Sequence, residues 1–151
     1  MTTKLHTLCD RKCRPLATVV SGGQCNDNTL MLETLDAVRV PRAGRGRPRK
    51  RPGLILGDKG YSYPSCRRQL RGRGLKRVIP ERRDQREQRA AKGQKGGRPC
   101  KFDRELYKER NVVERTFLRL KQSRRVATRY DKTKASYEAF VTLASIRLWL
   151  K

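Results

Sequence analysis

The chain has 151 residues, with 39 Lys and Arg against 14 Asp and Glu, and a formal net charge of +25 at pH 7. A charge this one-sided favours a polyanionic partner, of which nucleic acid is the commonest. A membrane is disfavoured, because Gly and Pro break the basic stretches and no apolar run approaches the ~20 residues of a membrane span. On charge alone, a ribosomal or nucleoid-packing protein remains an alternative.

The remaining composition indicates one small domain, or a piece of a larger one, in a reducing compartment. Hydrophobic residues make up only 35% of the chain, so the core is expected to be small. The chain carries five cysteines at irregular spacing and no export signal, which favours reduced thiols in a cytoplasm.

The N-terminal third predicts a hairpin followed by a helix. Residues 4–9 and 15–20 have the pattern of short strands, with a polar turn between them. Asp27 is placed to cap a helix that runs to about Val38. Residues 39–53 then form a basic Gly/Pro linker without periodicity, which we expect to be mobile.

The middle of the chain predicts two further strands around a helix. Residues 54–57 form a short apolar strand that ends at Asp58, and residues 76–79 form another. A helix from about Pro64 to Leu70 lies between them and is stopped by glycines. Residues 81–101 are basic, polar and Gly-rich, and we expect them to be mobile as well.

The C-terminal third predicts two helices. The first begins near Asp103, its expected N-cap, and runs to about Arg125. The second spans about Lys134 to Leu150. Its apolar residues expected to be buried are Tyr137, Phe140, Val141, Ala144, Ile146, Leu148 and Trp149. The order of strands and helices predicts a mixed α/β layer.

Asp58 is the first candidate for chemistry. It lies where an apolar strand meets Lys59-Gly60-Tyr61, and the carboxyl end of a buried strand is the usual place for ligand and metal sites in α/β proteins. Gly60 would allow a close approach to the carboxylate. The alternative is an aspartate that only forms a turn before glycine.

A strip of polar residues on the long helix is the second candidate. Tyr107, Arg110, Glu114 and Lys121 fall at offsets of 0, 3, 7 and 14, which place them on one face of a helix. A neighbouring apolar stripe consists of Leu106, Val113, Phe117 and Leu120. Glu114 is therefore expected to be half-buried at the margin of the core, with Arg110 able to orient it and Lys121 able to meet a phosphate. A solvated face with ion pairs is the alternative.

These motifs together resemble a known family. The string Tyr107-x2-Arg110-x3-Glu114-x6-Lys121 matches the signature around the final glutamate of bacterial insertion-sequence transposases of the DDE class. The segments LILGDKGYSY and KRVIP resemble the second-aspartate region of this family, ERNVVERTFLRLKQSRRVATRYDK its C-terminal block and KLHTLCDRKCRPLATVVSGGQCND its early hairpin. The resemblance covers nearly the whole chain and is closest to the group of insertion-sequence family five.

The resemblance implies an RNase H-like mixed sheet flanked by helices, with Asp58 as the second metal-binding aspartate and Glu114 as the last acidic ligand. Tyr107, Arg110 and Lys121 would support the site and contact the DNA end. Carboxylates of this kind hold Mg²⁺ (or Mn²⁺) ions for phosphodiester cleavage. The expected partners are double-stranded DNA, both insertion-sequence ends and target, and further copies of the chain, in the bacterial cytoplasm at the nucleoid.

The chain departs from the family at one place. The first aspartate of the family lies on an opening strand upstream of the block that begins here at Thr3. Asp10 falls in a turn and Asp27 at a helix start, so neither is expected to replace it. Residues 1–151 are thus expected to be a partial catalytic domain that lacks the first strand, completed by an upstream-frame product. The alternatives are a non-catalytic DNA-binding remnant and a product of an internal start.

The first basic linker contains a second resemblance. Gly44-Arg45-Gly46-Arg47-Pro48, followed by Arg49 and Lys50, resembles an AT-hook, whose core lies extended in the narrow minor groove of A·T-rich DNA. The alternative is a solvated basic linker that binds phosphates without sequence preference. The second basic stretch, residues 82–101, has no such core, and generic contact with the DNA backbone is expected there.

Overall fold

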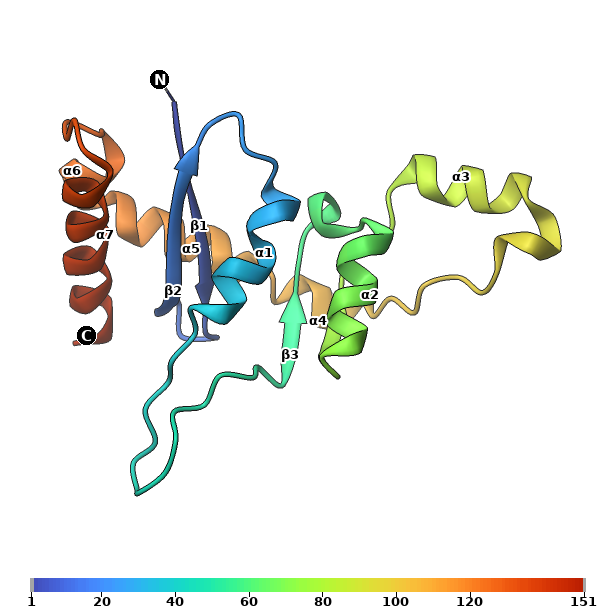
Figure 1. Ribbon diagram of the computed structural model, residues 1–151, viewed down its shortest axis with the longest axis horizontal. Coiled ribbons are helices and arrows are strands. Elements are labelled where there is room, and N and C mark those ends of the chain that lie inside the picture. Colours follow the sequence, from blue (N-terminus) through green and yellow to red (C-terminus); the bar gives the residue numbers. More distant parts are fainter. Residues whose placement is uncertain (1, 151) are drawn as a thin grey trace. The chain divides into compact units, whose positions relative to one another are not determined.

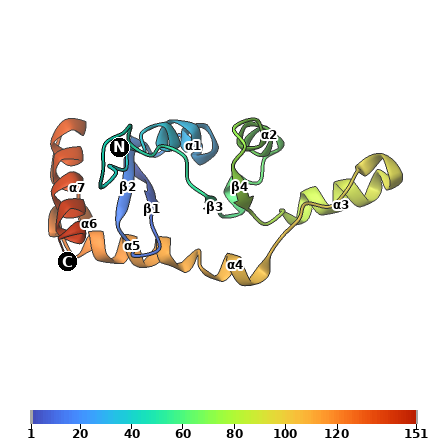
Figure 2. The same ribbon diagram turned by 90° about the horizontal axis from the view of Figure 1, so that it is seen from below.

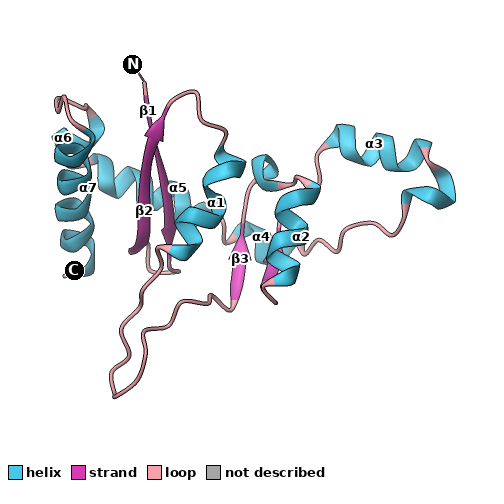
Figure 3. Ribbon diagram, in the orientation of Figure 1, coloured by secondary structure: helices cyan, strands magenta, loops and turns pink. Residues whose placement is uncertain are grey.

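The structure, a computed structural model, describes residues 2–150 and divides into two compact units. We call Met1–Arg51 together with Asn111–Lys151 the first unit, and Pro52–Arg110 the second unit. Each unit combines short strands with helices, so the predicted mixed α/β class is confirmed (Figure 1 and Figure 3).

Two strands at the N-terminus form the predicted hairpin of the first unit. Strand β1 (Thr3–Cys9) pairs antiparallel with β2 (Pro15–Gly22), and Leu5 lies opposite Val20. Side chains alternate between the two faces of a strand. Leu5 and Val20 therefore contribute to the core on one face, while His6 lies on the other.

The hairpin turn is held by one carboxylate. Asp10 accepts hydrogen bonds on Oδ1 from the backbone N–H groups of Lys12 (2.9 Å) and Arg14 (3.0 Å), and on Oδ2 from Nε of Arg14 (2.7 Å). Cys13 takes a positive φ of 62° to close the turn. Asp10 thus stabilises the turn in which the sequence placed it.

Helices from both segments of the first unit pack on the hairpin. Helix α1 (Asp27–Asp36) contacts both strands, α5 (Asn111–Lys121) contacts β1, and α7 (Lys134–Trp149) contacts β2. Figure 2 shows α1 and α5 on opposite sides of the hairpin. The short helix α6 (Arg124–Ala127) joins α5 to α7. The core cluster of this unit consists of Val20, Leu120, Val126, Tyr137, Val141, Ala144 and Leu148, with Leu5 packed against it.

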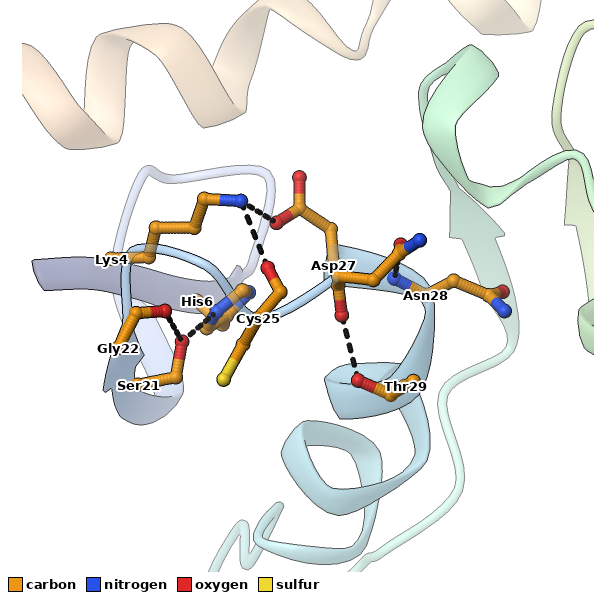
Figure 4. Close-up of polar contacts among 9 residues, drawn as sticks. Lys4, His6, Ser21, Gly22, Cys25, Asp27, Asn28 and Thr29 are labelled. Atoms are coloured by element: carbon orange, nitrogen blue, oxygen red, sulfur yellow. Dashed lines mark hydrogen bonds and ion pairs between the residues drawn. The ribbon is translucent and has the colours of Figure 1, made fainter.

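The N-cap of helix α1 lies one residue earlier than predicted. Asn26 is the N-cap, and its side chain accepts a hydrogen bond from the backbone N–H of Asn28 at 3.0 Å. Asp27 instead pairs with Lys4 at 3.2 Å, and the same ammonium donates to the carbonyl of Cys25 (Figure 4). The prediction of Asp27 as the cap was wrong because Asn and Asp cap helices about equally well.

The predicted long helix from 103 to 125 is three helices. Asp103 caps α4 (Arg104–Lys108) as predicted, but the helix does not continue through Glu109 and Arg110. The backbone N–H groups of these two residues donate to carbonyls only three residues earlier, which tightens the turn and interrupts the α-helical pattern. The sequence contains no Gly or Pro here to mark the interruption.

Helix α7 matches the predicted range, but its burial is narrower than predicted. Tyr137, Val141, Ala144 and Leu148 are buried, as expected, and Phe140 is half-buried. Ile146 and Trp149 are exposed, contrary to expectation. Trp149 is nevertheless held, because its indole N–H donates to the carbonyl of Pro15 at 2.8 Å.

The second unit begins with a β-α-β arrangement. Strand β3 (Leu54–Leu56) pairs in parallel with β4 (Lys76–Val78), and α2 (Pro64–Gly72) is the crossover that a parallel pair requires. Gly74, at a φ of +66°, makes the turn from α2 to β4. The buried apolar residues of this unit are Ile55, Cys66, Leu70, Leu75, Val78 and Ile79.

Regular structure also occurs in the second basic stretch. Residues 81–101, which the sequence analysis left without a helix or strand, contain helix α3 (Arg83–Ala91) and a 3₁₀ turn, η2 (Gly93–Gly96) (Figure 3). Arg89 forms an ion pair with Glu81 that ties α3 to the preceding segment. Among the helices of residues 2–150, none is long and apolar enough to cross a membrane.

Candidate functional site

Asp58 lies at the carboxyl end of β3, as the sequence predicted. Ile55 and Gly57 before it are buried, and Asp58 itself is exposed. Its side chain caps the 3₁₀ turn η1 (Lys59–Tyr61), since Oδ1 accepts the backbone N–H of Gly60 at 2.7 Å. The carboxylate is thus fixed at one oxygen, while the residue stays open to solvent.

Gly60 leaves room for this arrangement. A Cβ atom at this position would lie 2.9 Å from Oδ1 of Asp58, closer than real Cβ contacts. With any other residue here, the carboxylate of Asp58 would have to shift.

Arg67, on helix α2, fixes the segments that follow both strands of the second unit. Its Nε donates to the carbonyl of Ser62 at 3.2 Å, directly after η1. One terminal nitrogen donates to the carbonyls of Ile79 (2.8 Å) and Pro80 (3.2 Å), directly after β4. Arg67 was not predicted as important, because the same short helix carries two other arginines, Arg68 and Arg71. Its position next to the buried residue Cys66 was the signal that could have distinguished it.

A shallow, open depression borders the turn after Asp58. Its lining residues are Lys59, Gly60, Arg82, Arg83, Asp84 and Glu87. Arg82 pairs with Asp84 at 3.0 Å and donates to the hydroxyl of Tyr63 at 3.3 Å, which fixes its guanidinium. The start of α3 therefore places cations near the turn that follows Asp58, which was not predicted from the sequence.

Glu114 lies in the first turn of α5 and is exposed. The buried stripe of this helix consists of Val112, Thr116 and Leu120. The predicted stripe included Leu120, which is buried, but also Val113 and Phe117, which are only half-buried. The expectation of a half-buried Glu114 was therefore wrong, because the hairpin packs against a different side of the helix.

The four residues of the predicted strip do not share one helix. Tyr107 and Arg110 belong to the second unit, where the Arg110 guanidinium lies 5.7 Å from the centre of the Tyr107 ring. Glu114 and Lys121 belong to the first unit, both exposed on α5. The structure brings Tyr107 and Arg110 together as predicted, and it assigns Asp58 and Glu114 to different units.

Comparison with known proteins then fixes the family. Residues 1–149 match the protein family described as the transposase DDE domain. The chain belongs to this family. It is also similar to two candidate transposases of bacterial insertion sequences, and no solved structure matches it.

The first of these relatives belongs to insertion sequence element IS402 of Burkholderia cepacia. It is 33% identical over 141 residues, which cover 93% of this chain and 59% of that protein. The chain therefore spans less than two thirds of that relative. The second belongs to element IS6501 of Brucella ovis and is 29% identical over 158 residues, which cover the whole of both proteins.

The candidate metal ligands of this chain are two carboxylates, and the structure assigns them to different units. Asp58 and Glu114 each present exposed carboxylate oxygens, the hard donors that Mg²⁺ and Mn²⁺ prefer. Within residues 2–150, no group of three or more His, Cys, Asp or Glu side chains is close enough to hold a metal ion. The donor type fits a divalent cation, and each described carboxylate alone would be an incomplete site.

Proposed function

We propose that this chain supplies the second aspartate and the final glutamate of an RNase H-like catalytic domain that cuts and joins DNA at insertion-sequence ends. The observation that carries the proposal is Asp58, exposed at the end of a buried strand and held by the N–H of Gly60, in a chain that belongs to the transposase DDE family. The net charge of +25 supports double-stranded DNA as the substrate. A DNA substrate also places the protein at the bacterial nucleoid.

Asp58 and Glu114 would hold Mg²⁺ or Mn²⁺ through their carboxylates. Divalent ions bound in this way polarise the phosphate and lower the pKa of the attacking water or hydroxyl. The hydrogen bond from Gly60 fixes one oxygen of Asp58, so the other oxygen keeps a defined direction toward a ligand.

The remaining site residues act on the DNA. The guanidinium of Arg110 lies 5.7 Å from the centre of the Tyr107 ring, and these two residues would contact the DNA near the transposon end. Lys121, at the last turn of α5, would meet another phosphate as a point charge. Lys59, Arg82 and Arg83 add positive charge around the turn that follows Asp58, although Asp84 and Glu87 offset part of it.

A third carboxylate is required to complete the site. We propose that it comes from an opening strand encoded by an upstream frame, and that several copies act together on paired ends. A second function is a DNA-binding protein without catalysis, which would compete with active transposase for its ends. The observation that favours it is the net charge of +25, because binding to DNA phosphates requires only positive charge.

The test is metal-dependent cleavage and strand transfer on the insertion-sequence end of the chain's own element. Three proteins are compared: this chain, the chain fused to a segment with the first aspartate, and the fused form carrying Glu114→Gln. We expect activity only in the unmodified fused form. Glu105→Gln is the matched control, because Glu105 is an exposed glutamate on α4 that pairs with Lys108.

The outcomes separate the two functions. Loss of at least ~1000-fold in activity with Glu114→Gln and none with Glu105→Gln would support the catalytic role, since removing a group that acts in the transition state costs this order of rate. Retained DNA binding with no cleavage in any form, with either Mg²⁺ or Mn²⁺, would favour the non-catalytic function instead.

A further inference from the structure

The basic linker between α1 and β3 has a defined base. Val40 and Arg49 form an isolated antiparallel bridge, in which the N–H of Val40 donates to the carbonyl of Arg49 at 3.0 Å and the reverse bond is 2.8 Å. The eight residues 41–48 between them therefore form a closed loop, which Figure 1 shows as a long, narrow excursion after α1. Every residue from 41 to 50 is exposed. We call residues 41–48 the basic loop.

Among residues 2–150, no ion pair holds the cations of the basic loop. Residues 39–51 contain no Asp or Glu. Arg39 is used at the end of α1, where its guanidinium donates to the carbonyls of Asp36 and Val38. In the part of the chain that the structure describes, no ion pair involves Arg45, Arg47 or the remaining cations, Arg42, Arg49, Lys50 and Arg51. Several positive charges held this close favour an external anion.

The glycines of the loop have no role in packing within the chain. A Cβ atom added to Gly44 would meet nothing within 4 Å, and one added to Gly46 would meet only Cδ of Arg42 at 3.9 Å. Gly46 also has a φ of +136°, which other residues rarely adopt. Contacts within the chain therefore do not require the absence of side chains at Gly44 and Gly46. Their absence would allow a ligand to approach the backbone closely.

The narrow minor groove of A·T-rich DNA is such a ligand. It is only about 6 Å wide, and its strong negative potential attracts arginines inserted into it. Arg45 and Arg47 alternate with glycines, so the backbone between them can approach the groove floor. Pro48 lacks an N–H group and fixes φ, which favours an extended path out of the groove.

We infer that the basic loop is a preformed finger that binds the minor groove of A·T-rich DNA, with Arg45 and Arg47 in the groove and Arg49 and Lys50 on the flanking phosphates. This site adds base preference to the DNA binding of the proposed function, on which it rests for its role in transposition. It requires neither a metal ion nor Asp58 or Glu114. The bridge between Val40 and Arg49 restricts the loop before binding, which lowers the entropy that binding costs.

The test uses the full chain and fluorescent duplexes of equal length, one with a central A·T tract and one entirely G·C. We expect the A·T duplex to bind about tenfold tighter, the scale on which base discrimination usually operates. Netropsin, which occupies the A·T minor groove, should abolish the difference. The salt dependence should be similar for both duplexes, because phosphate contacts dominate it.

Two variants separate groove binding from charge. Gly44→Ala has open space around it, so the thermal stability should be unchanged while the A·T preference falls to about one. The double change Arg45→Lys and Arg47→Lys keeps the charge and should also remove the preference. The matched control is Arg68→Lys with Arg71→Lys, two exposed arginines of α2, which should preserve it.

The inference would be overturned by equal affinity for the two duplexes at every salt concentration, or by a preference that Gly44→Ala leaves intact. Because no cleavage is measured, failure of the proposed catalytic function would leave this result unaffected. Conversely, an active transposase with equal affinity for both duplexes would overturn the inference of minor-groove binding and leave the catalytic proposal unaffected.

Discussion

The direction of the Asp58 carboxylate depends on the absence of a Cβ atom at Gly60. In Gly60→Ala, the new Cβ would lie 2.9 Å from Oδ1, so the carboxylate would rotate and lose its 2.7 Å bond to the backbone. We expect the cleavage rate of the active form to fall by roughly 100-fold, the usual cost of ~1 Å misplacement of a reacting group, with a higher Mg²⁺ requirement.

Gly72→Ala is the control for this change. Gly72 ends α2 in open space, so the added methyl group should leave the cleavage rate unchanged. An unchanged rate and Mg²⁺ requirement in Gly60→Ala would show that the orientation of Asp58 is unimportant.

Arg67 stabilises the second unit by satisfying three carbonyl groups with two nitrogens. A lysine has one compact donor group and cannot reach the carbonyls of Ser62, Ile79 and Pro80 together. We expect Arg67→Lys to destabilise this unit by about 1–3 kcal/mol, because partly buried carbonyls lose their partners. Urea unfolding measures this loss, with the exposed neighbour Arg68→Lys as the control.

A role of Arg67 in positioning Asp58 has a separate readout. Amide hydrogen exchange at Gly60 and Ser62 should accelerate in Arg67→Lys under conditions where the unit remains folded. Unchanged exchange at both amides, together with unaltered unfolding, would mean that Arg67 does not hold this turn.

At the scale of elements, the contact between the hairpin and α1 predicts a pH effect. His6 is buried at 7% exposure and shares a 2.8 Å hydrogen bond with the hydroxyl of Ser21 (Figure 4). Burial lowers the pKa of His6 below its ordinary value of 6.5; Asp27 and Glu33 raise it, and Lys4 lowers it further. The unfolded chain therefore binds a proton at a higher pH than the folded chain.

The stability contributed by neutral His6 is complete above about pH 6.5 and is lost as the pH falls toward the lowered pKa. We expect the urea midpoint of the first unit to fall between pH 7.5 and pH 5.5. His6→Gln keeps a hydrogen-bonding group near Ser21 and should reduce this fall. Since His6 is the single histidine of the chain, an equal fall in both proteins would assign the effect elsewhere.

The elements that could be predicted from the sequence are those in which local pattern and capping agree. The hairpin and α7 combine strand or helix periodicity with clear boundaries. Helix α3 was missed because composition was given more weight than propensity: Arg83–Ala91 is rich in Arg, Gln and Ala, which form helices well. The interruption at Glu109 and Arg110 could not be predicted, since no Gly or Pro marks it in the sequence.

At the scale of the whole molecule, the sequence predicted the family correctly. The roles of the candidate site residues stay predictions, and the surroundings of some of them differ from those expected. The spacing of Tyr107, Arg110, Glu114 and Lys121 is a linear pattern, so it is readable without a fold. The exposure of Glu114 and the three carbonyls around Arg67 depend on which face each helix buries. Such facts follow from packing, which linear patterns determine only in part.

The first unit is built from two segments separated by the 59 residues of Pro52–Arg110. During synthesis the hairpin leaves the ribosome with Leu5 and Val20 uncovered, because Leu120 and Val141 of their core follow at least a hundred residues later. At about 5–20 residues per second, this delay is on the order of 5–20 s or more. During that interval the nascent hairpin exposes apolar side chains on a strongly cationic chain. We therefore expect chaperones to bind it at the exit of the ribosomal tunnel.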